Sequence, residues 1–308
     1  MKMKTVLQRT MVLIILCYVI QEHTTTAVTD TDCKGGGIFE KSLRVHQLLK
    51  QVHTDGDVVA RTFYTEYVNK NDKSKELEQK IFDSLKFEFD VASCIFKGVA
   101  TVGGIENAVI YVHTTKYVFM SLRYTLDLFS KMNGLGKMEK DLSLFATVLN
   151  SVLLYGKKDP KHSETYSGET FMCGDLKKLP VKEHVVFHTF MPSSEKREIA
   201  IQYAVKKGHT SCVYIFKNDQ HSSKYSPRSI SALSYDPKDK EVVFPIGATF
   251  QKIECTSADT QPFNSVTHSG IVCLDLISDK NRKELMSKQY KPAEISTEQN
   301  NCIQSDKP

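Results

Sequence analysis

The sequence predicts an α+β fold in which a helical N-terminal half packs on a β-rich C-terminal half. Two observations lead to this prediction. Apolar residues recur at helical spacing over residues 38–155. From Pro160 onward, the chain instead holds short β-branched and aromatic runs separated by turn signals, which is typical of strands. The 308 residues are 41% hydrophobic and 25% charged, a composition that is sufficient for a buried core.

The first 27 residues predict a signal peptide. Lys2, Lys4 and Arg9 form a basic start, and the apolar run Met11–Ile20 that follows is too short to span a membrane. We expect cleavage near Ala27 and a secreted, extracellular protein. The formal net charge of +5 is too small and too evenly spread to indicate a nucleic-acid partner.

The helical half contains five segments with apolar residues at helical spacing. The predicted helices cover Phe39–Val52, Val58–Val68, Leu77–Phe89, Met120–Met132 and Leu142–Tyr155. The segment Ile105–Phe119 is richer in β-branched and aromatic residues and leads into the fourth of these helices. The glycine-rich stretch Gly98–Gly104 lacks the Lys-Ser/Thr pair of a phosphate-binding loop, so it predicts a turn.

The β-rich half contains short runs that predict strands, and one helix. The predicted strands are Thr165–Tyr166, Val185–Phe190, Cys212–Phe216, Val242–Pro245, Ala248–Ile253 and Gly270–Leu276. The helix covers Ser194–Val205, with Ser193 or Ser194 as its N-cap. We therefore expect a folded domain over residues 28–277, with a helical part at 38–155 and a β-rich part at 162–277.

From Ser278 the chain is polar to its end and has no terminal apolar segment. This composition predicts a mobile tail over residues 278–308 and no membrane anchor.

Two acidic residues, Asp239 and Glu241, precede the strand predicted from Val242. Side chains two residues apart on an extended strand share a face, so these carboxylates are expected to point the same way. Two carboxylates at such a position can hold a sugar hydroxyl and a cationic acceptor together. An isolated Asp-x-Glu more often only solvates a turn, so the surrounding residues decide between these interpretations.

The cysteines favour disulfides over a metal site. All but Cys17 follow the predicted leader, at Cys33, Cys94, Cys173, Cys212, Cys255, Cys273 and Cys302. No Cys-x-x-Cys pair is present, and a secreted chain favours disulfides, with one thiol of the odd set left free or bonded between chains. His184 and His188 are four residues apart, and the strand predicted through Val185–Phe187 separates their rings too far to share one ion, so we expect no bound metal.

Three blocks of residues follow one another in the second half of the chain. Val185–Ser194 carries Phe-Met-Pro-Ser-Ser and precedes a helix, Ser211–Phe216 contains a cysteine, and Tyr235–Ile253 holds Asp-Lys-Glu and then Phe-Gln-Lys-Ile. In this order they resemble blocks of the secreted or surface-anchored arginine-specific mono-ADP-ribosyltransferases of vertebrate type. Weaker similarities lie at Ala108–Thr115 and His268–Cys273, so the resemblance covers residues 33–275.

This resemblance implies a split antiparallel β-core of ADP-ribosyltransferase type. It also implies a reaction in which NAD or NADP loses nicotinamide and ADP-ribose passes to an arginine of an acceptor protein. Glu241 would hold the ribose and stabilise positive charge, and Asp239 would orient the guanidinium. The dinucleotide-binding residues implied in the same way are Ser167, Gly168, Ser193 and Ser194. We expect no metal and a monomer.

The family pattern is incomplete in this chain. Ser167 stands where the family has an arginine, and Pro192 where it has the first serine of its Ser-x-Ser element. A neutral serine cannot replace a charged, bidentate contact with phosphate. Three bases could supply such charge from another direction: Lys177, Lys178 and Arg197.

Two functions therefore stay open. The first is a secreted mono-ADP-ribosyltransferase or NAD glycohydrolase, and the second is a catalytically inactive binding protein or toxin-like effector with the same fold. The resemblance also implies two disulfides, Cys33–Cys273 and Cys173–Cys212. It leaves Cys94, Cys255 and Cys302 unassigned.

Overall fold

The computed structural model describes residues 61, 64–65, 71–131, 137–156, 163–207, 211–218, 223–260 and 270–289. The predicted signal peptide, Cys33, Cys302 and the helix predicted over Phe39–Val52 lie outside these residues.

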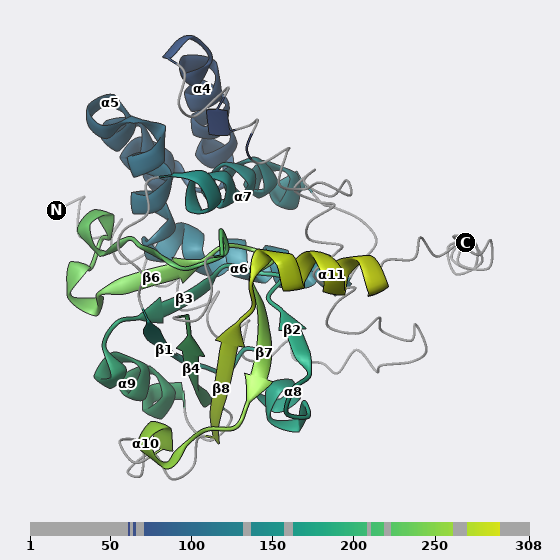
Figure 1. Cartoon of the computed structure of the whole chain (residues 1–308). Coiled ribbons are helices and arrows are strands. Elements are labelled where there is room, and N and C mark those ends of the chain that lie inside the picture. The colour runs from purple at the N-terminus through teal and green to yellow at the C-terminus, as the bar shows by residue number, and fades with distance from the viewer. Residues whose placement is uncertain are drawn as a thin grey trace, which may run out of the picture. The chain divides into compact units, whose positions relative to one another are not determined.

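In the described part of the first half, four long helices lie together (Figure 1). They are α4 (Asn71–Glu88), α5 (Asp90–His113), α6 (Lys116–Lys131) and α7 (Lys137–Tyr155). The helices predicted over Leu77–Phe89 and Leu142–Tyr155 cover most of α4 and most of α7, which both begin earlier than predicted. The segment Ile105–Phe119 is helical apart from a short turn, because burial of its apolar face outweighs its β-branched composition.

Helix α5 shows that the turn predicted over Gly98–Gly104 was wrong. The helix continues through this stretch and is kinked only at Gly104, which has φ 76° and ψ 174°. Residues Val91–His113 have the length and mean hydropathy (1.3) of a membrane span. Of this apolar window 39% is buried, and the buried residues include Ala108, Val109 and Val112, which belong to the protein core.

The second half of the described chain forms one mixed sheet of 8 strands, in the order β2-β7-β8-β4-β1-β3-β6-β5. The strands are β1 (Glu164–Glu169), β2 (His184–Val186), β3 (Met191–Ser194), β4 (Cys212–Lys217), β5 (Arg228–Ser229), β6 (Glu241–Phe244), β7 (Thr249–Ile253) and β8 (Gly270–Leu276). The α+β class is confirmed. One pairing, β4 with β8, is parallel where an antiparallel core was expected.

The sheet changes direction where β1 meets β3. These two strands pair at one register position, Tyr166 with Ser194. In Figure 1, β3 and β6 run across the direction of β7 and β8. The β-core is thus one hydrogen-bonded sheet with two differently oriented parts, and this junction lies beside Glu241, which pairs with Ser194.

Several smaller elements were not predicted. The strand predicted over Val185–Phe190 ends at Val186 in β2, which pairs with β7, and β3 begins only at Met191 and pairs with β6. Strand β5 and the short helices α8 (Cys173–Lys178) and α10 (Ser257–Thr260) are new. The predicted mobile tail begins with a helix, α11 (Asp279–Gln289). Asp279 accepts a hydrogen bond from Ser223 Oγ (2.8 Å), and the Arg282 guanidinium lies 4.2 Å from the Tyr225 ring centroid.

Buried side chains of the described residues form three clusters. The first joins α4, α5, α6 and α7 to the sheet through Phe190, Ile230, Val243 and Ile246. The second is rich in phenylalanine and contains Phe187, Phe216, Phe244 and Phe250. The third contains Tyr166, Ala200, Ala204, Val213, Ile215 and Cys273, so it lies between the sheet and α9 (Arg197–Lys207). Arg228 reinforces the first cluster by donating to the Val152 carbonyl (3.0 Å) and to Glu106 (2.5 Å).

The disulfides agree with one predicted pair and contradict the other. Cys173 bonds to Cys212, as predicted. Cys273 bonds to Cys255, so the predicted Cys33–Cys273 pair is wrong. The physical reason is the antiparallel β7–β8 register, which opposes Ile253 to Cys273 and brings Cys255 beside it. Among the described cysteines, Cys94 is free and exposed.

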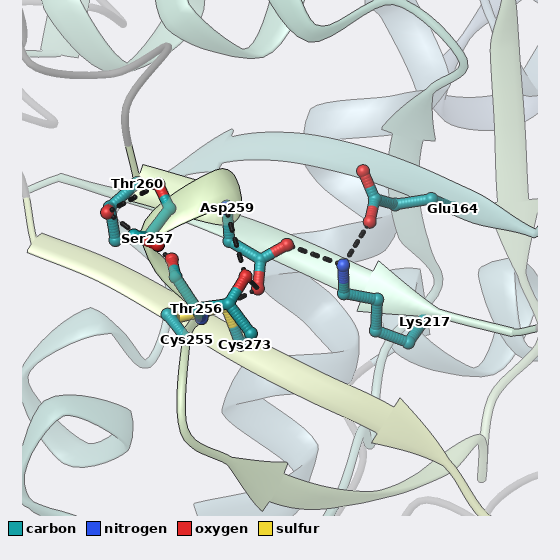
Figure 2. Close-up of a disulfide and its surroundings, with 8 residues drawn as sticks. All are labelled: Glu164, Lys217, Cys255, Thr256, Ser257, Asp259, Thr260 and Cys273. Atoms are coloured by element: carbon teal, nitrogen blue, oxygen red, sulfur yellow. Dashed lines mark hydrogen bonds and ion pairs between the residues drawn. A yellow bond between two sulfur atoms is a disulfide. The ribbon is translucent and has the colours of Figure 1, made fainter.

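An ion-pair network borders the second disulfide. Figure 2 shows Lys217 between Glu164 and Asp259, with the Cys255–Cys273 bond nearby. The Lys217–Asp259 contact is 2.5 Å, and Asp259 also accepts a hydrogen bond from the Thr256 backbone N–H (2.8 Å). This network ties the α10 segment to β1 and β4.

Candidate functional site

The predicted acids lie on a tight segment, Asp236–Glu241, which we call the acidic turn. Asp236 caps a 3₁₀ turn, η3 (Pro237–Asp239), by accepting a hydrogen bond from the Lys238 backbone N–H. Proline at the first position of such a turn is favourable because its φ is already fixed. Lys240 then adopts a left-handed conformation (φ 47°, ψ 48°), and β6 begins at Glu241. The chain therefore reverses between the two acids.

This geometry corrects the expected basis of the acid pair. Asp239 ends a 3₁₀ turn and Glu241 begins a strand, so the two residues are not neighbours on one face of an extended strand. They still interact, because the charge of Asp239 is one of the causes that raise the pKa of Glu241. The pair therefore rests on a turn and not on the strand period.

The register of three strands places one predicted serine beside Glu241. Tyr166 on β1 lies opposite Ser194 on β3, and Ser194 lies opposite Glu241 on β6, so their side chains share one face. Ser194 Oγ donates to the Asp239 carbonyl (2.6 Å) and accepts from the Lys196 N–H (3.0 Å). Ser194 therefore fixes both the acidic turn and the approach to α9.

Ser193 faces the other way. Its neighbour across β6 is Val242, and its hydroxyl lies 3.2 Å from the Val242 carbonyl and 3.3 Å from Thr165 Oγ1. Of the two serines, Ser194 is the one on the Glu241 face.

Glu241 carries a perturbed carboxyl group. Burial first, and the charge of Asp239 second, raise its pKa from 4.5 to about 7. In the described part of the chain, the Glu241 side chain has no hydrogen-bond donor and no basic side chain as a partner. A desolvated carboxylate without a partner costs stability, and such groups are found disproportionately at functional sites. At neutral pH it can exchange a proton or stabilise a positive charge.

Tyr203 is a site residue that the sequence did not reveal. Its hydroxyl donates to Asp239 Oδ2 (3.0 Å) from α9, and its side chain is 44% exposed. Burial first, and the hydrogen bond to Asp239 second, raise the pKa of Tyr203 to about 12, so it stays a donor. The sequence does not identify Tyr203 as a site residue, because its hydrogen-bond partner depends on how α9 packs on β1.

Ser167 and Gly168 lie on β1 and have no described contact with Glu241. Ser167 follows Tyr166 on an extended strand, so its side chain points to the opposite face. Gly168 lies under α9, where an added Cβ would come within 2.0 Å of the Ala200 carbonyl oxygen. The structure thus gives Gly168 a packing role, and the contacts of both residues with a dinucleotide stay predictions.

Of the three candidate bases, Arg197 lies on the Glu241 face of the sheet. Its guanidinium stacks over the Tyr166 ring at 5.0 Å from the centroid, and Nη2 donates to Tyr166 Oη (3.1 Å) and Glu164 Oε1 (3.3 Å). Its side chain remains 30% exposed. Lys177 and Lys178 lie instead on α8, which packs on β8.

The helical half holds the loop that leads into the acidic turn. The Tyr235 backbone N–H donates to Thr114 Oγ1 (2.8 Å), and the Tyr235 and Tyr111 rings meet edge to face at 6.3 Å. Ile230 is buried in the core that the helices share with the sheet. No group of three His, Cys, Asp or Glu side chains among the described residues could hold a metal ion.

Comparisons with known proteins give similarity in structure. No family model matches the chain, and no curated protein matches its sequence. The Vis toxin, an ADP-ribosyltransferase from Vibrio splendidus, is 15% identical over 68% of this chain and 89% of its own, with a TM-score of 0.41. The ADP-ribosyltransferase HopU1 of Pseudomonas syringae pv. Tomato is 14% identical over 66% and 97%, with a TM-score of 0.44. The eukaryotic mono-ADP-ribosyltransferase ART2.2 is 14% identical over 66% and 83%, with a TM-score of 0.42. At 14–15% identity, these similarities concern the fold alone.

Proposed function

We propose that this protein is a secreted mono-ADP-ribosyltransferase, which releases nicotinamide from NAD and transfers ADP-ribose to an arginine side chain of an acceptor protein. The observation that carries the proposal is Glu241, a desolvated carboxylate without a described partner, placed beside a second acid, Asp239. The leader-like N-terminus and the two disulfides support secretion.

The two carboxylates suit two parts of this reaction. The bond between the ribose C1′ and nicotinamide breaks, its electron pair leaves with neutral nicotinamide, and positive charge develops on the ribose. A negative charge held at the place where this charge appears lowers the barrier. We assign this role to Glu241. Asp239 then holds the acceptor guanidinium, whose nitrogen forms the new bond to C1′ and passes one proton to a base or to water.

The raised pKa of Glu241 predicts the direction of the pH dependence. The stabilising form is the carboxylate, which is lost on protonation as the pH falls through about 7. We therefore expect the rate of nicotinamide release to rise between pH 6 and pH 8.

Arg197 supplies one positive charge on the same face. Its planar guanidinium is suited to contact phosphate oxygens, and 30% of its side chain is exposed. We propose that it contacts the NAD diphosphate in place of the strand arginine that Ser167 replaces.

Transfer of ADP-ribose to agmatine, a small guanidinium compound, tests the proposal. The mature protein and two variants, Glu241→Gln and Glu254→Gln, are incubated with NAD and agmatine, and the product is detected by mass spectrometry. We expect the wild type and the Glu254→Gln control to form ADP-ribosyl-agmatine, because Glu254 is exposed. Glu241→Gln should lose about 100-fold or more of the rate. An equal rate in all three proteins would contradict the assignment.

A second function is favoured by two observations. Ser167 lies on the face opposite Glu241, and Arg197 is already engaged with Glu164, so charge for the diphosphate is limited. This arrangement suits a non-catalytic binding protein. Calorimetric binding of NAD or of an arginine compound without any product would support this function.

A further inference from the structure

We infer that Tyr203 is a positioning residue for the transfer step, which holds the Asp239 carboxylate where it receives the guanidinium of the acceptor. This inference rests on the proposed function and assigns a role to a residue on α9, outside the acidic turn.

The position of α9 is fixed by close packing on β1. Gly168 has no Cβ, and an added one would lie 2.0 Å from the Ala200 carbonyl oxygen and 2.5 Å from the Ala204 nitrogen. Ala200 and Ala204 are fully buried against the sheet, and Ser211 Oγ donates to the Ala204 carbonyl (2.7 Å). The backbone that carries Tyr203 therefore has little freedom to move away from the sheet.

The Tyr203 ring is also held from the next turn of the helix. Lys207 Nζ lies 5.8 Å from the ring centroid, which is a favourable cation–π contact. The same nitrogen donates to Glu169 Oε2 (2.7 Å) and to the Gly168 carbonyl (3.1 Å). Because Lys207 is anchored on β1, it orients the ring of Tyr203 as well.

Asp239 is then held at two points. Ser194 Oγ binds its carbonyl oxygen (2.6 Å), and the Tyr203 hydroxyl binds Oδ2 (3.0 Å). The first contact fixes the main chain of the turn, and the second fixes the side-chain rotamer. Without the hydroxyl, the carboxylate would lose its only described side-chain partner and would have to be ordered by the acceptor itself.

The hydrogen bond from Tyr203 to Asp239 also distinguishes the two carboxylates. The single donor of Tyr203 is used on Asp239, so Glu241 keeps no donor among the described residues. Asp239 Oδ1 likewise has no described partner and remains available to a guanidinium N–H. Asp239 is itself only half-buried and the neighbouring Tyr203 is 44% exposed, so an acceptor can approach this carboxylate from solvent.

The test compares two tyrosine variants that each remove one hydroxyl. Tyr203→Phe keeps the ring but loses the bond to Asp239, and Tyr235→Phe is the control, with no described bond to that carboxylate. For each protein, the KM for agmatine and the rate of nicotinamide release without acceptor are measured. We expect Tyr203→Phe to raise the KM for agmatine about 10-fold, because a hydrogen bond to a charged group is lost. Acceptor-free release should stay within about 2-fold, and Tyr235→Phe should match the wild type.

The rate of nicotinamide release without agmatine also shows whether the variant is folded. If transfer and release fall together in Tyr203→Phe, the residue has only a structural role and the inference is overturned. An unchanged KM for agmatine overturns it as well. In an Asp239→Asn background, Tyr203→Phe should cause no further rise in KM, and an additive rise would contradict action through Asp239. A wild type that releases no nicotinamide overturns the proposed function and this inference together, whereas the preceding outcomes overturn the inference alone.

Discussion

Replacing Glu241 by glutamine should stabilise the protein at alkaline pH while it removes the proposed activity. The folded state holds the proton of Glu241 more tightly than the unfolded state, because its pKa is raised from 4.5 to about 7. As the pH rises from 4.5 to 7, the unfolded chain loses this proton first, and the free energy of unfolding falls. Above pH 7 the whole cost of the ionised, desolvated carboxylate is present.

The size of this cost follows from the pKa difference. A rise of about 2.5 units corresponds to about 3 kcal/mol at 1.36 kcal/mol per unit. Glu241 is partly exposed, so water reduces the cost, and we expect a gain of about 1–3 kcal/mol for Glu241→Gln at pH 8. At pH 5 the wild-type carboxyl is mostly protonated in the folded state, so the gain should shrink to less than about one third.

Urea denaturation at pH 8 and pH 5 measures both values. Glu254→Gln removes a carboxylate from an exposed position and controls for the change in net charge. We expect the control to change the free energy of unfolding by less than about 0.5 kcal/mol at either pH. A Glu241→Gln variant that is no more stable than the wild type at pH 8 would show that the carboxylate is not desolvated, and it would refute the reasoning.

Three further predictions concern the scaffold around the site. His113 is fully buried between Phe119 and Phe190, and burial lowers its pKa from 6.5 to about 4. The free energy of unfolding should therefore keep its full value above pH 6.5 and fall by about 3 kcal/mol as the pH drops to 4. His113→Leu should remove this contribution in acid denaturation curves, and an unchanged curve would contradict it. Gly168→Ala should cost about 1–3 kcal/mol, because its Cβ would displace α9, and a neutral melting temperature would be inconsistent with the packing. Replacing Cys173 and Cys212 together by alanine should cost about 2–5 kcal/mol in urea, since the bond closes a separation of 39 residues, and an undiminished unfolding midpoint would argue against the bond.

Local patterns in the sequence were sufficient for the class of the fold and for most of its larger elements. Apolar residues at helical spacing identified Leu142–Tyr155, and a β-branched run identified Gly270–Leu276, because burial of one face leaves a periodic trace. The same reasoning failed at Gly98–Gly104, where α5 holds the three glycines at exposed positions and is kinked only at Gly104. It also failed at α11, whose polar residues are held by contacts with distant segments.

The candidate site could be predicted only in part. Asp239 and Glu241 were identified as a pair from their types and spacing, but the left-handed conformation of Lys240 between them leaves no sequence trace. The partner of Cys273 depends on the β7–β8 register. The contact of Tyr203 with Asp239 depends on how α9 packs on Gly168 of β1. These features depend on tertiary contacts, which a single sequence does not record.

The rate of nicotinamide release from NAD at pH 8, measured for the mature wild type and for Glu241→Gln, addresses the role of Glu241 most directly. We predict steady release by the wild type and a rate at least about 100-fold lower in the variant, even though the variant is the more stable protein. Release at the same rate in both proteins, or none in either, would contradict the assignment of Glu241 as the residue that stabilises the charge on the ribose.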